Sequence, residues 1–593
     1  MRLKSVSKRI GLSLVLIASF PAVSPALTND IALTPQMGWN DWNSYGCGIS
    51  QAAVTNTAGV IAANGMKAAG YRFINIDDGW ASSRDANGVI QAYPTKFPDG
   101  IQWLADYVHA RGLKLGIYTD HGTNTCSSCI SGATPPKQPG SFDHEYIDAF
   151  TYASWDVDYL KNDSCNLPVG DIPHDDYFRM ADGLRQAGQP IFVSLCPNAA
   201  HYEYWSPDVG NSWRTTGDIH NTFASMISKI DQNSKSAYLA GPGRWNDPDM
   251  LEIGNGEFVT NLVGAQTHFT MWCIMAAPLI AGNNVTTMSA ATLAILTNDE
   301  AIAVDQDPAG EQGEFVGGLR DSAEVWSKPL GYDFTTRAVA LLNRSASTPA
   351  TITCYWTNLA FQAGTTATVR DLWTHQDLGT FTDSFTATVP AYGSRLLKII
   401  GTPVAPPSPG TNYLTMLQPL YAYCGWGAMT NNRSIGGNPL TLDGVVYTNG
   451  IGTHAIGGNE YNLGGVVSRL HATVGVDDEV GANGSVIFQV IADGRKIYDS
   501  GILTGGGPSK TVDLDLTGVR RLTIGVTDTG NDVSGNRNSN DHSDWADAYV
   551  VVTNPVPQVP ETPAGLTARA GNSIALDWND TLAALTYNVK RAT

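Results

Sequence analysis

The chain is poor in basic residues, and this deficit bears on the partners it can bind. It has 36 lysines and arginines against 55 aspartates and glutamates, which gives a formal net charge of -19 at pH 7. A nucleic-acid backbone would be repelled by that charge, so we expect no nucleic-acid partner. The eight cysteines among 593 residues are too sparse and too irregularly spaced to define a disulfide framework.

Metal-binding and redox signatures are also scarce. Cys126-Ser127-Ser128-Cys129 is a lone CxxC motif, and a zinc site would need a second pair. A structural disulfide from Cys126 or Cys129 to Cys165 is the expected use of these cysteines. The sequence contains no EF-hand loop or comparable oxygen-rich spacing, so we expect no metal and no cofactor.

Only one long apolar run stands out, and it lies at the N-terminus. Residues 11–23 are apolar, follow four basic residues, and precede the small-residue site Ser24-Pro25-Ala26. The run is shorter than the roughly 20 residues of a membrane-spanning helix. The pattern predicts a signal peptide over residues 1–26 and a secreted protein, extracellular or periplasmic, with no membrane partner.

The chain is too long for a single core, because such cores stop growing at roughly 250 to 300 residues. From 27 to 308, apolar runs of strand length alternate with helical stretches, which is typical of a parallel sheet covered on both sides. A count near eight predicts an α/β fold, a (β/α)₈ TIM barrel. After a strand near Met37, the predicted strands are 72–77, 114–119, 157–162, 190–196, 212–216, 245–253 and 272–280.

The later segments read as all-β. Short alternating strands predict an antiparallel β-sandwich domain over 309–402, and the proline-rich stretch 403–411 predicts a semi-stiff linker. Residues 412–553 predict a second all-β sandwich. Residues 554–593 begin like a fibronectin type III module, but they are too few for its roughly seven strands, so we expect a linker and a truncated segment.

Polar and aromatic side chains gather where the predicted barrel strands end. Because the C-terminal ends of these strands share one mouth, we expect the side chains to converge there. Hydrolysis of a glycosidic bond with retention needs a carboxylate nucleophile and a second carboxyl group about 5 to 5.5 Å away. The mouth therefore predicts a glycoside hydrolase. The residues are Trp42, Asp77, Asp78, Tyr118, Asp120, Lys161, Asp163, Arg214 and Asp218.

Asp163 and Asp218 are the candidate catalytic pair. Lys161 lies two residues before Asp163, so both side chains point to one side of the strand and the cation can keep Asp163 ionised as a nucleophile. Asp218 suits the acid/base role, which requires a raised pKa. We therefore expect Arg214 to bind a sugar hydroxyl rather than to neutralise Asp218.

Six motifs stand out along the first two predicted domains: Met37–Trp42, Asp77-Asp78, Leu115–Tyr118, Tyr159–Cys165, Trp213–Asp218 and Gly241–Met250. Together they resemble glycoside hydrolase family 27, the family of α-galactosidases and α-N-acetylgalactosaminidases. The resemblance covers about residues 31–400 and implies that Asp163 is the nucleophile and Asp218 the acid/base. It also implies that Trp42, Asp77, Asp78, Tyr118, Lys161 and Arg214 line the sugar subsite, and that Cys126 and Cys165 form a disulfide.

The chain departs from that family after the fifth predicted strand. Family α-galactosidases usually have Cys-Glu-Trp there, with the glutamate contacting the 2-hydroxyl, whereas this chain has Cys196-Pro197-Asn198. Cys196 and Asn198 are candidate substrate-binding residues. The leading interpretation is a retaining α-galactosidase acting on oligo- or polysaccharides. The alternatives are an α-N-acetylgalactosaminidase, another α-glycosidase of the family, or a non-catalytic sugar-binding protein.

The second predicted β-sandwich contains four motifs, Gly425–Gly427, Gly450–Ala455, Gly475–Val480 and Asp541–Ala548. They resemble the NPCBM carbohydrate-binding modules, which implies that this module binds a carbohydrate. Aspartates in these motifs fit either turn caps or a Ca²⁺ site. Trp426 and Trp545 are equally compatible with a place in the core and with a ligand platform.

Overall fold

The computed structural model of the chain describes residues 31–129, 138–168, 173–197, 202–332, 334–528, 540–553, 567–569 and 575–577. The predicted signal peptide and the candidate residue Asn198 lie outside the described residues. Within the described ranges, no helix combines the length and apolar character needed to span a bilayer.

The first domain is built on an eight-stranded sheet with the order β10-β1-β2-β5-β6-β7-β8-β9. Every pairing along it is parallel. A parallel bridge joins Leu251, just after β9, to Ala281 in β10, so the sheet closes into the predicted barrel. The strands are β1 (Met37–Asn40), β2 (Phe73–Asn75), β5 (Lys114–Asp120), β6 (Tyr159–Asp163), β7 (Phe192–Leu195), β8 (Ser212–Arg214), β9 (Trp245–Asp247) and β10 (Leu279–Ala281).

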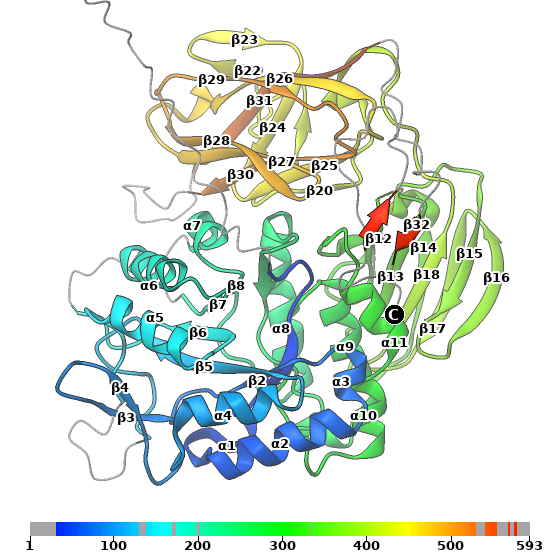
Figure 1. Ribbon diagram of the computed structural model, residues 1–593. Helices are drawn as coiled ribbons and strands as arrows, with labels where there is room; N and C mark the ends of the chain where they lie inside the picture. Colours follow the sequence, from blue (N-terminus) through cyan, green and yellow to red (C-terminus); the bar gives the residue numbers. More distant parts are fainter. Residues whose placement is uncertain are drawn as a thin grey trace, which may run out of the picture.

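Helices follow the barrel strands and cover the outside of the sheet (Figure 1). In α4, the buried residues Ile101, Leu104, Ala105 and Val108 recur at helical spacing and form the face turned to the core. The helices are α1 (Trp42–Tyr45), α2 (Gln51–Ala63), α3 (Met66–Ala69), α4 (Gly100–His109), α5 (Glu145–Ser154), α6 (Pro173–Ala187), α7 (Tyr202–Val209), α8 (Phe223–Asn233), α9 (Leu262–Ile274), α10 (Ala290–Leu296) and α11 (Asp299–Asp305). A small hairpin, β3 (Ala81–Arg84) and β4 (Ile90–Ala92), is inserted after β2.

The predicted strand over 272–280 is wrong in its first half. Trp272–Ile274 end α9, and β10 begins only at Leu279. Helix α9 is buried around most of its surface, including every residue from Thr267 to Ile274. A helix buried on all sides shows no amphipathic period, so its apolar run reads like a buried strand.

The second domain is antiparallel, as predicted, and packs beside the barrel. Its main sheet has the order β11-β12-β13-β18-β15-β16, and β14 pairs with β17. A cluster of buried residues that includes Val339, Trp356 and Leu397 forms its core. The strands are β11 (Glu314–Leu319), β12 (Ala323–Leu330), β13 (Thr336–Asn343), β14 (Ala350–Tyr355), β15 (Thr366–Asp371), β16 (Gln376–Thr382), β17 (Ser384–Val389) and β18 (Ser394–Ile400).

The third domain, which we call the C-terminal module, contains two larger sheets that face each other. One has the order β21-β24-β31-β26-β29, with β19 paired to β31, and the other has the order β20-β25-β30-β27-β28. Trp545 of β31 packs edge-on against Phe488 of β27, with ring centroids 5.2 Å apart, so Trp545 belongs to the core. The strands are β19 (Gly410–Tyr413), β20 (Tyr421–Tyr423), β21 (Thr430–Asn431), β22 (Leu440–Leu442), β23 (Val445–Tyr447), β24 (Gly450–His454), β25 (Gly457–Asn462), β26 (Val467–Val476), β27 (Ser485–Ala492), β28 (Arg495–Thr504), β29 (Lys510–Asp515), β30 (Arg521–Asp528) and β31 (His542–Val552).

Little of the predicted fibronectin-like tail is described. Two short strands, β32 (Thr567–Arg569) and β33 (Ala575–Asp577), pair antiparallel. The rest of the predicted segment, 554–566, 570–574 and 578–593, lies outside the described residues.

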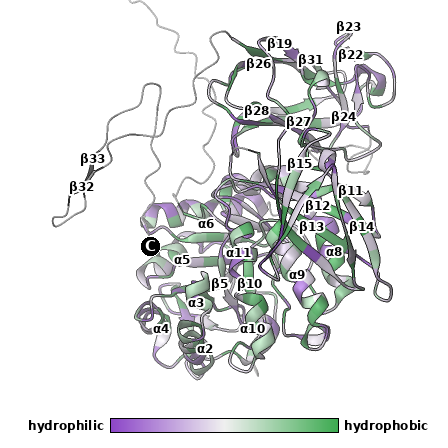
Figure 2. Cartoon of the chain, turned by 90° about the vertical axis from the view of Figure 1, so that its right-hand side faces the viewer, coloured by the Kyte–Doolittle hydropathy of each residue, from purple (hydrophilic) through white to green (hydrophobic). Residues whose placement is uncertain are grey.

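The C-terminal module is held against the base of the barrel. Arg244 donates to the carbonyl of Gly494 over 2.5 Å, and Lys496 lies 3.5 Å from the carboxylate of Asp208. Arg244 directly precedes β9 and Asp208 shortly precedes β8, so both lie at the N-terminal ends of strands. The C-terminal ends, where barrel sites form, are at the opposite end. Both ribbon views show the module stacked on the other two domains (Figures 1 and 2).

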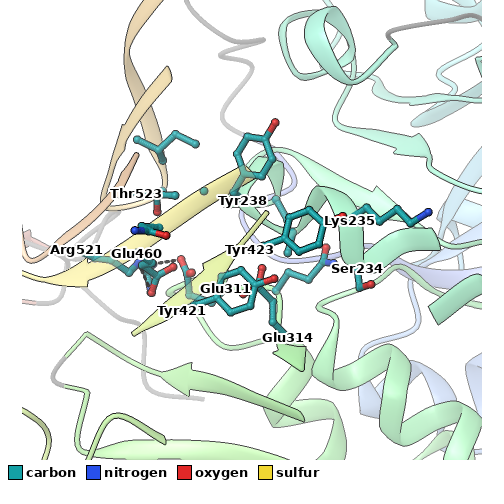
Figure 3. Close-up of a pocket in the computed structure, with 17 residues that line it drawn as sticks. Ser234, Lys235, Tyr238, Glu311, Glu314, Tyr421, Tyr423, Glu460, Arg521 and Thr523 are labelled. Carbon is teal, nitrogen blue, oxygen red and sulfur yellow. Dashed lines mark ion pairs between the residues drawn. The ribbon is translucent and has the colours of Figure 1, made fainter. Parts of the chain in front are cut away.

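Buried charges gather where the module meets the other domains (Figure 3). Arg521 of β30 forms an ion pair with Glu311, which lies between α11 and β11. Glu460 of β25 and Glu314 of β11 lie in the same junction. Burial and the nearby Glu460 raise the pKa of Glu314 well above its usual range. The junction thus joins the module to the other domains through polar contacts as well as packing.

Candidate active site

The C-terminal ends of the barrel strands surround a cavity of about 760 Å³. Strands β2, β5, β6, β7 and β8, or the residues directly after them, contribute side chains to it, and Trp42 adds one from α1. Apart from Asn198, every residue that the sequence nominated for catalysis or sugar binding lines this cavity: Trp42, Asp77, Asp78, Tyr118, Lys161, Asp163, Cys196, Arg214 and Asp218.

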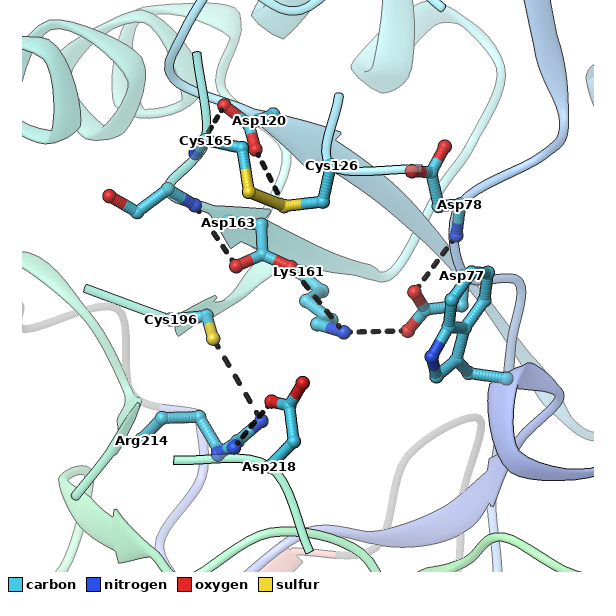
Figure 4. A network of polar contacts seen from close by, with 12 residues as sticks. Asp77, Asp78, Asp120, Cys126, Lys161, Asp163, Cys165, Cys196, Arg214 and Asp218 are labelled. Atoms are coloured by element: carbon cyan, nitrogen blue, oxygen red, sulfur yellow. Dashed lines mark hydrogen bonds and ion pairs between the residues drawn. A yellow bond between two sulfur atoms is a disulfide. The ribbon is translucent and has the colours of Figure 1, made fainter. Parts of the chain in front are cut away.

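Lys161 links two of the carboxylates. Its Nζ lies 2.8 Å from Oδ2 of Asp77 and 3.8 Å from Oδ2 of Asp163 (Figure 4). Burial opposes the charge of Lys161, but the two aspartates outweigh it and raise the pKa of the lysine well above its usual range. Oδ1 of Asp163 accepts the N–H of Ser164 over 3.0 Å. Asp163 is therefore oriented by a cation and by the backbone.

Asp77 and Asp78 are fixed by donors from separate parts of the chain. Oδ2 of Asp77 also accepts the side-chain amide of Asn40 over 2.8 Å. Oδ2 of Asp78 accepts the N–H and the hydroxyl of Ser127, at 2.9 and 2.6 Å. Burial raises the pKa of Asp78.

Two buried polar atoms at the mouth can form hydrogen bonds to a ligand. Oδ1 of Asp78 and the hydroxyl of Tyr118 are buried and make no hydrogen bond within the described part of the chain. Buried polar atoms are normally satisfied. Both residues line the cavity, so hydroxyl groups of a bound sugar are suitable partners.

The expectation for Asp218 needs a correction. Its side chain is 84% exposed, and its Oδ1 lies 3.0 Å from Nη2 of Arg214. Partial burial alone would raise the pKa of Asp218, but the charge and hydrogen bond of Arg214 outweigh it, and the pKa is lowered. The expectation that Arg214 would not neutralise Asp218 is therefore wrong. The carboxylate lies four residues away and can contact the guanidinium while it stays exposed to solvent. The guanidinium also pairs with Asp249 over 3.0 Å.

Cys196 and Pro197 occupy the side of the cavity beside Arg214. Sγ of Cys196 lies 3.9 Å from Nη1 of Arg214, and the cysteine is in no disulfide. Burial and the neighbouring Asp163 raise the pKa of the thiol well above its usual range, so the group stays protonated. Pro197 lines the cavity where the resemblance leads one to expect a glutamate.

Two disulfides fix the loop that follows β5. Cys126 pairs with Cys165, and Cys129 pairs with Cys47. The first pairing selects Cys126 over Cys129 as the partner of Cys165. The second joins residues 82 positions apart, and no spacing rule predicts such a pairing. Ser127, the partner of Asp78, lies between the two bridges.

Three acidic residues near the cavity escaped assignment from sequence. Oδ1 of Asp41 accepts the N–H of Asp77 over 2.6 Å, and Asp249 pairs with Arg214. Asp41 lies in the motif Met37–Trp42 and Asp249 in the motif Gly241–Met250, so their place in these motifs could have identified them from the sequence. Asp120 ends β5 beside Asp163 and was visible only as one more acid at a strand end.

Known proteins resemble about three fifths of this chain. A probable α-galactosidase of Dictyostelium discoideum is 42% identical over 393 residues, covering 64% of this chain and 95% of the relative. An α-galactosidase of Oryza sativa is 46% identical over 352 residues, 59% of this chain and 81% of the relative. The crystal structure of α-galactosidase I from Mortierella vinacea superposes with a TM-score of 0.58 at 33% identity, covering 64% of this chain and all of that one.

A closed barrel whose mouth holds paired aspartates together with a lysine and an arginine defines a glycosidase of the TIM-barrel class. Residues 34–307 match the family described as alpha galactosidase A, and 320–399 match its C-terminal β-sandwich domain. The chain belongs to glycoside hydrolase family 27, the α-galactosidase family. Residues 410–551 match the NPCBM/NEW2 domain.

Proposed function

We propose that this chain is a secreted, retaining α-galactosidase that releases terminal α-linked galactose from oligo- or polysaccharides. The observation that carries the proposal is the convergence of Asp163 and Asp218 on one cavity, beside Lys161 and Arg214 (Figure 4). The names of the relatives support galactose as the sugar, as does a Saccharomyces cerevisiae α-galactosidase solved with raffinose, at 27% identity and a TM-score of 0.59.

The reaction is a double displacement. A carboxylate oxygen of Asp163 attacks the anomeric carbon while Asp218 gives its proton to the leaving oxygen, so the glycosidic bond breaks as a glycosyl-enzyme ester forms. In the second step, Asp218 takes a proton from water, the water oxygen attacks the same carbon, and Asp163 leaves as a carboxylate. Two inversions give net retention.

The remaining residues of the mouth hold the sugar. Asp77 and Asp78 accept hydrogen bonds from sugar hydroxyls, and Lys161 and Tyr118 donate to them. Trp42 supplies an aromatic face for the apolar side of the ring. Because these side chains are fixed by the protein before the substrate arrives, little ordering remains to be done on binding.

Asp163→Asn tests the assignment of the nucleophile. We expect loss of nitrophenyl α-galactoside hydrolysis by several orders of magnitude, with unchanged thermal unfolding. Asp175→Asn, an exposed position on α6, is the matched control and should stay active. Product analysis by NMR during turnover should show the α-anomer first. Full turnover by the Asp163 variant, or a β-anomer as the first product, would refute the mechanism.

An α-N-acetylgalactosaminidase is the second candidate, and it is favoured by Pro197. Proline cannot replace the carboxylate that accepts from the 2-hydroxyl in family α-galactosidases. Nitrophenyl α-galactoside and its 2-acetamido analogue separate the candidates. A clear preference in kcat/KM for the first substrate supports the proposal, and a clear preference for the second identifies the alternative.

Secretion and carbohydrate binding by the C-terminal module complete the proposal. The N-terminal charge and apolar pattern supports secretion. N-terminal sequencing of protein recovered outside the cell should begin after Ala26. For the module, Trp426 is 57% exposed and offers an aromatic face to a sugar. Trp426→Ala should reduce retention on polysaccharide columns, whereas Trp103→Ala, an exposed tryptophan on α4, should not.

A further inference from the structure

Asp120 is an acid that the mechanism does not use, although it lies beside the nucleophile. It ends β5 and stands opposite Asp163, its register partner at the end of β6. Its side chain is completely buried. Figure 4 shows it between the backbone of Cys165 and the Cys126–Cys165 disulfide.

The two oxygens of Asp120 have different surroundings. Oδ1 accepts two backbone N–H groups, from Gly122 over 2.7 Å and from Cys165 over 3.1 Å. Oδ2 lies 3.3 Å from Sγ of Cys126. That sulfur is bonded to another sulfur, carries no hydrogen and can only act as a weak acceptor. The only hydrogen that can lie in this contact is one on Oδ2 itself.

Gly122 allows the loop after β5 to lie directly against the loop after β6. A Cβ placed on Gly122 would lie 1.8 Å from the carbonyl oxygen of Cys165, so no other residue fits between Asp120 and the β6 loop. The N–H of Gly122 can therefore reach Oδ1 directly. Both backbone donors contact Oδ1, so a proton on this acid would lie on Oδ2.

The surrounding charges favour the same state. Asp163 of β6 and Asp78 after β2 face Asp120, together with Tyr118 of its own strand and Tyr177 of α6. A second negative charge at this buried position, beside an ionised nucleophile, would cost repulsion. Burial first and Asp163 second raise the pKa of Asp120 to about 8.

We propose that Asp120 is a protonated carboxylic acid whose hydroxyl donates to Sγ of the Cys126–Cys165 disulfide, and that it is a positioning residue for Asp163. It ties the end of β5 to the β6 loop and the disulfide without adding a charge next to the nucleophile. The positioning role rests on the proposed function of Asp163, whereas the protonation state does not.

Asp120→Asn tests this because asparagine reproduces the neutral acid. Its carbonyl oxygen accepts from Gly122 and Cys165, and its amide donates to the sulfur. Asp120→Leu, which lacks both oxygens, should lower kcat/KM near pH 5 by about tenfold or more, and Asp120→Asn should recover most of that loss. We also expect the unfolding temperature of the wild type to fall, relative to that of the variant, as pH rises from about 5 to about 9.

The stability of the folded wild type falls as pH rises because the acid binds its proton more tightly in the folded state than in the unfolded state. Because the folded-state pKa of Asp120 is raised from 3.8 to about 8, its contribution to stability is fully present below the ordinary pKa and is lost as pH rises through about 8. Asparagine does not titrate, so the variant loses this dependence. Infrared difference spectra should show a protonated carboxyl band in the wild type that disappears in the variant.

Asp176 provides the matched control. It is also completely buried, but it pairs with Arg179 and His121. Asp176→Asn should lower the unfolding temperature at pH 5 and at pH 9 alike, because it removes the carboxylate that pairs with Arg179. The proposal is overturned if Asp120→Asn behaves in the same way, or if the wild-type infrared band is unaffected by the substitution. The spectra and unfolding need no turnover, so they stand even if Asp163 is not the nucleophile.

Discussion

A single arginine sets the electrostatics at the acid/base candidate. Arg214 is paired with Asp218 and with Asp249, each over 3.0 Å, and it holds the pKa of Asp218 below its ordinary value. An acid catalyst works only while it keeps its proton. The free enzyme should therefore be most efficient at acid pH, with kcat/KM falling as pH rises through the lowered pKa of Asp218.

Arg214→Ala tests this at the scale of one residue. Removing the cation should raise the pKa of Asp218 and move the alkaline limb of the kcat/KM profile to higher pH by about 1 unit. The absolute kcat/KM should also fall, because Arg214 lines the sugar site. Lys229→Ala is the control, since Lys229 influences Asp218 more weakly and should shift the limb less. If the alkaline limb of the kcat/KM profile does not move in Arg214→Ala, the limb reports the titration of a group other than Asp218.

The identities of the mouth residues could be read from the sequence, but their pairings could not. Residues at the ends of parallel strands must share one mouth, which placed Asp77, Tyr118 and Lys161 correctly. Asp218 lies in the loop after β8, and the path of a loop decides whether it meets Arg214 or a ligand. The sequence does not distinguish Asp120 from other acidic residues at strand ends. Its environment depends on hydrogen bonds from the backbone N–H groups of Gly122 and Cys165, which form only in the folded chain.

At the scale of elements, the loop after β5 depends on its two disulfides. Replacing Cys47 and Cys129 together by serine should lower the free energy of unfolding by about 4.5 kcal/mol in the chain-entropy model, given the 82-residue separation. It should also lower kcat/KM, because Ser127 would no longer be held against Asp78. Thermal unfolding and kinetics without reductant measure both effects.

Cys424→Ser is the control for that variant, since Cys424 is a free cysteine in the C-terminal module. It should change neither quantity. Unaltered kinetics in the double variant would show that β5 and β2 hold the site without the bridge. The sequence could predict the strand pattern around this loop, but α9 and the Cys47–Cys129 bridge escaped prediction because both depend on contacts distant in sequence.

At the scale of the whole molecule, the junction between the module and the other domains should weaken as pH rises. Burial raises the pKa of Glu460 from 4.5 to about 7, opposed by Arg337. The raised value means that its contribution to stability is present below about 4.5 and is lost as pH rises through about 7. Calorimetry should show the module and barrel unfolding together near pH 5 and separating near pH 8.

Glu460→Gln should reduce that pH dependence, because glutamine does not titrate. Asp515→Asn, an exposed position on β29 away from the junction, is the matched control and should leave it unchanged. A junction equally stable at both pH values in the wild type would contradict the prediction. The sequence predicts a proline-rich linker before the C-terminal module. It does not predict the direct bonds between the barrel and the module, such as the one from Arg244 to Gly494, because these form only in the folded chain.

The attachment at the base of the barrel fixes the direction in which the enzyme faces. The module attaches at the N-terminal ends of β8 and β9, whereas the cavity lies at the C-terminal ends of the strands and is lined by barrel residues. Access to the cavity is therefore independent of whatever the opposite side of the molecule is attached to.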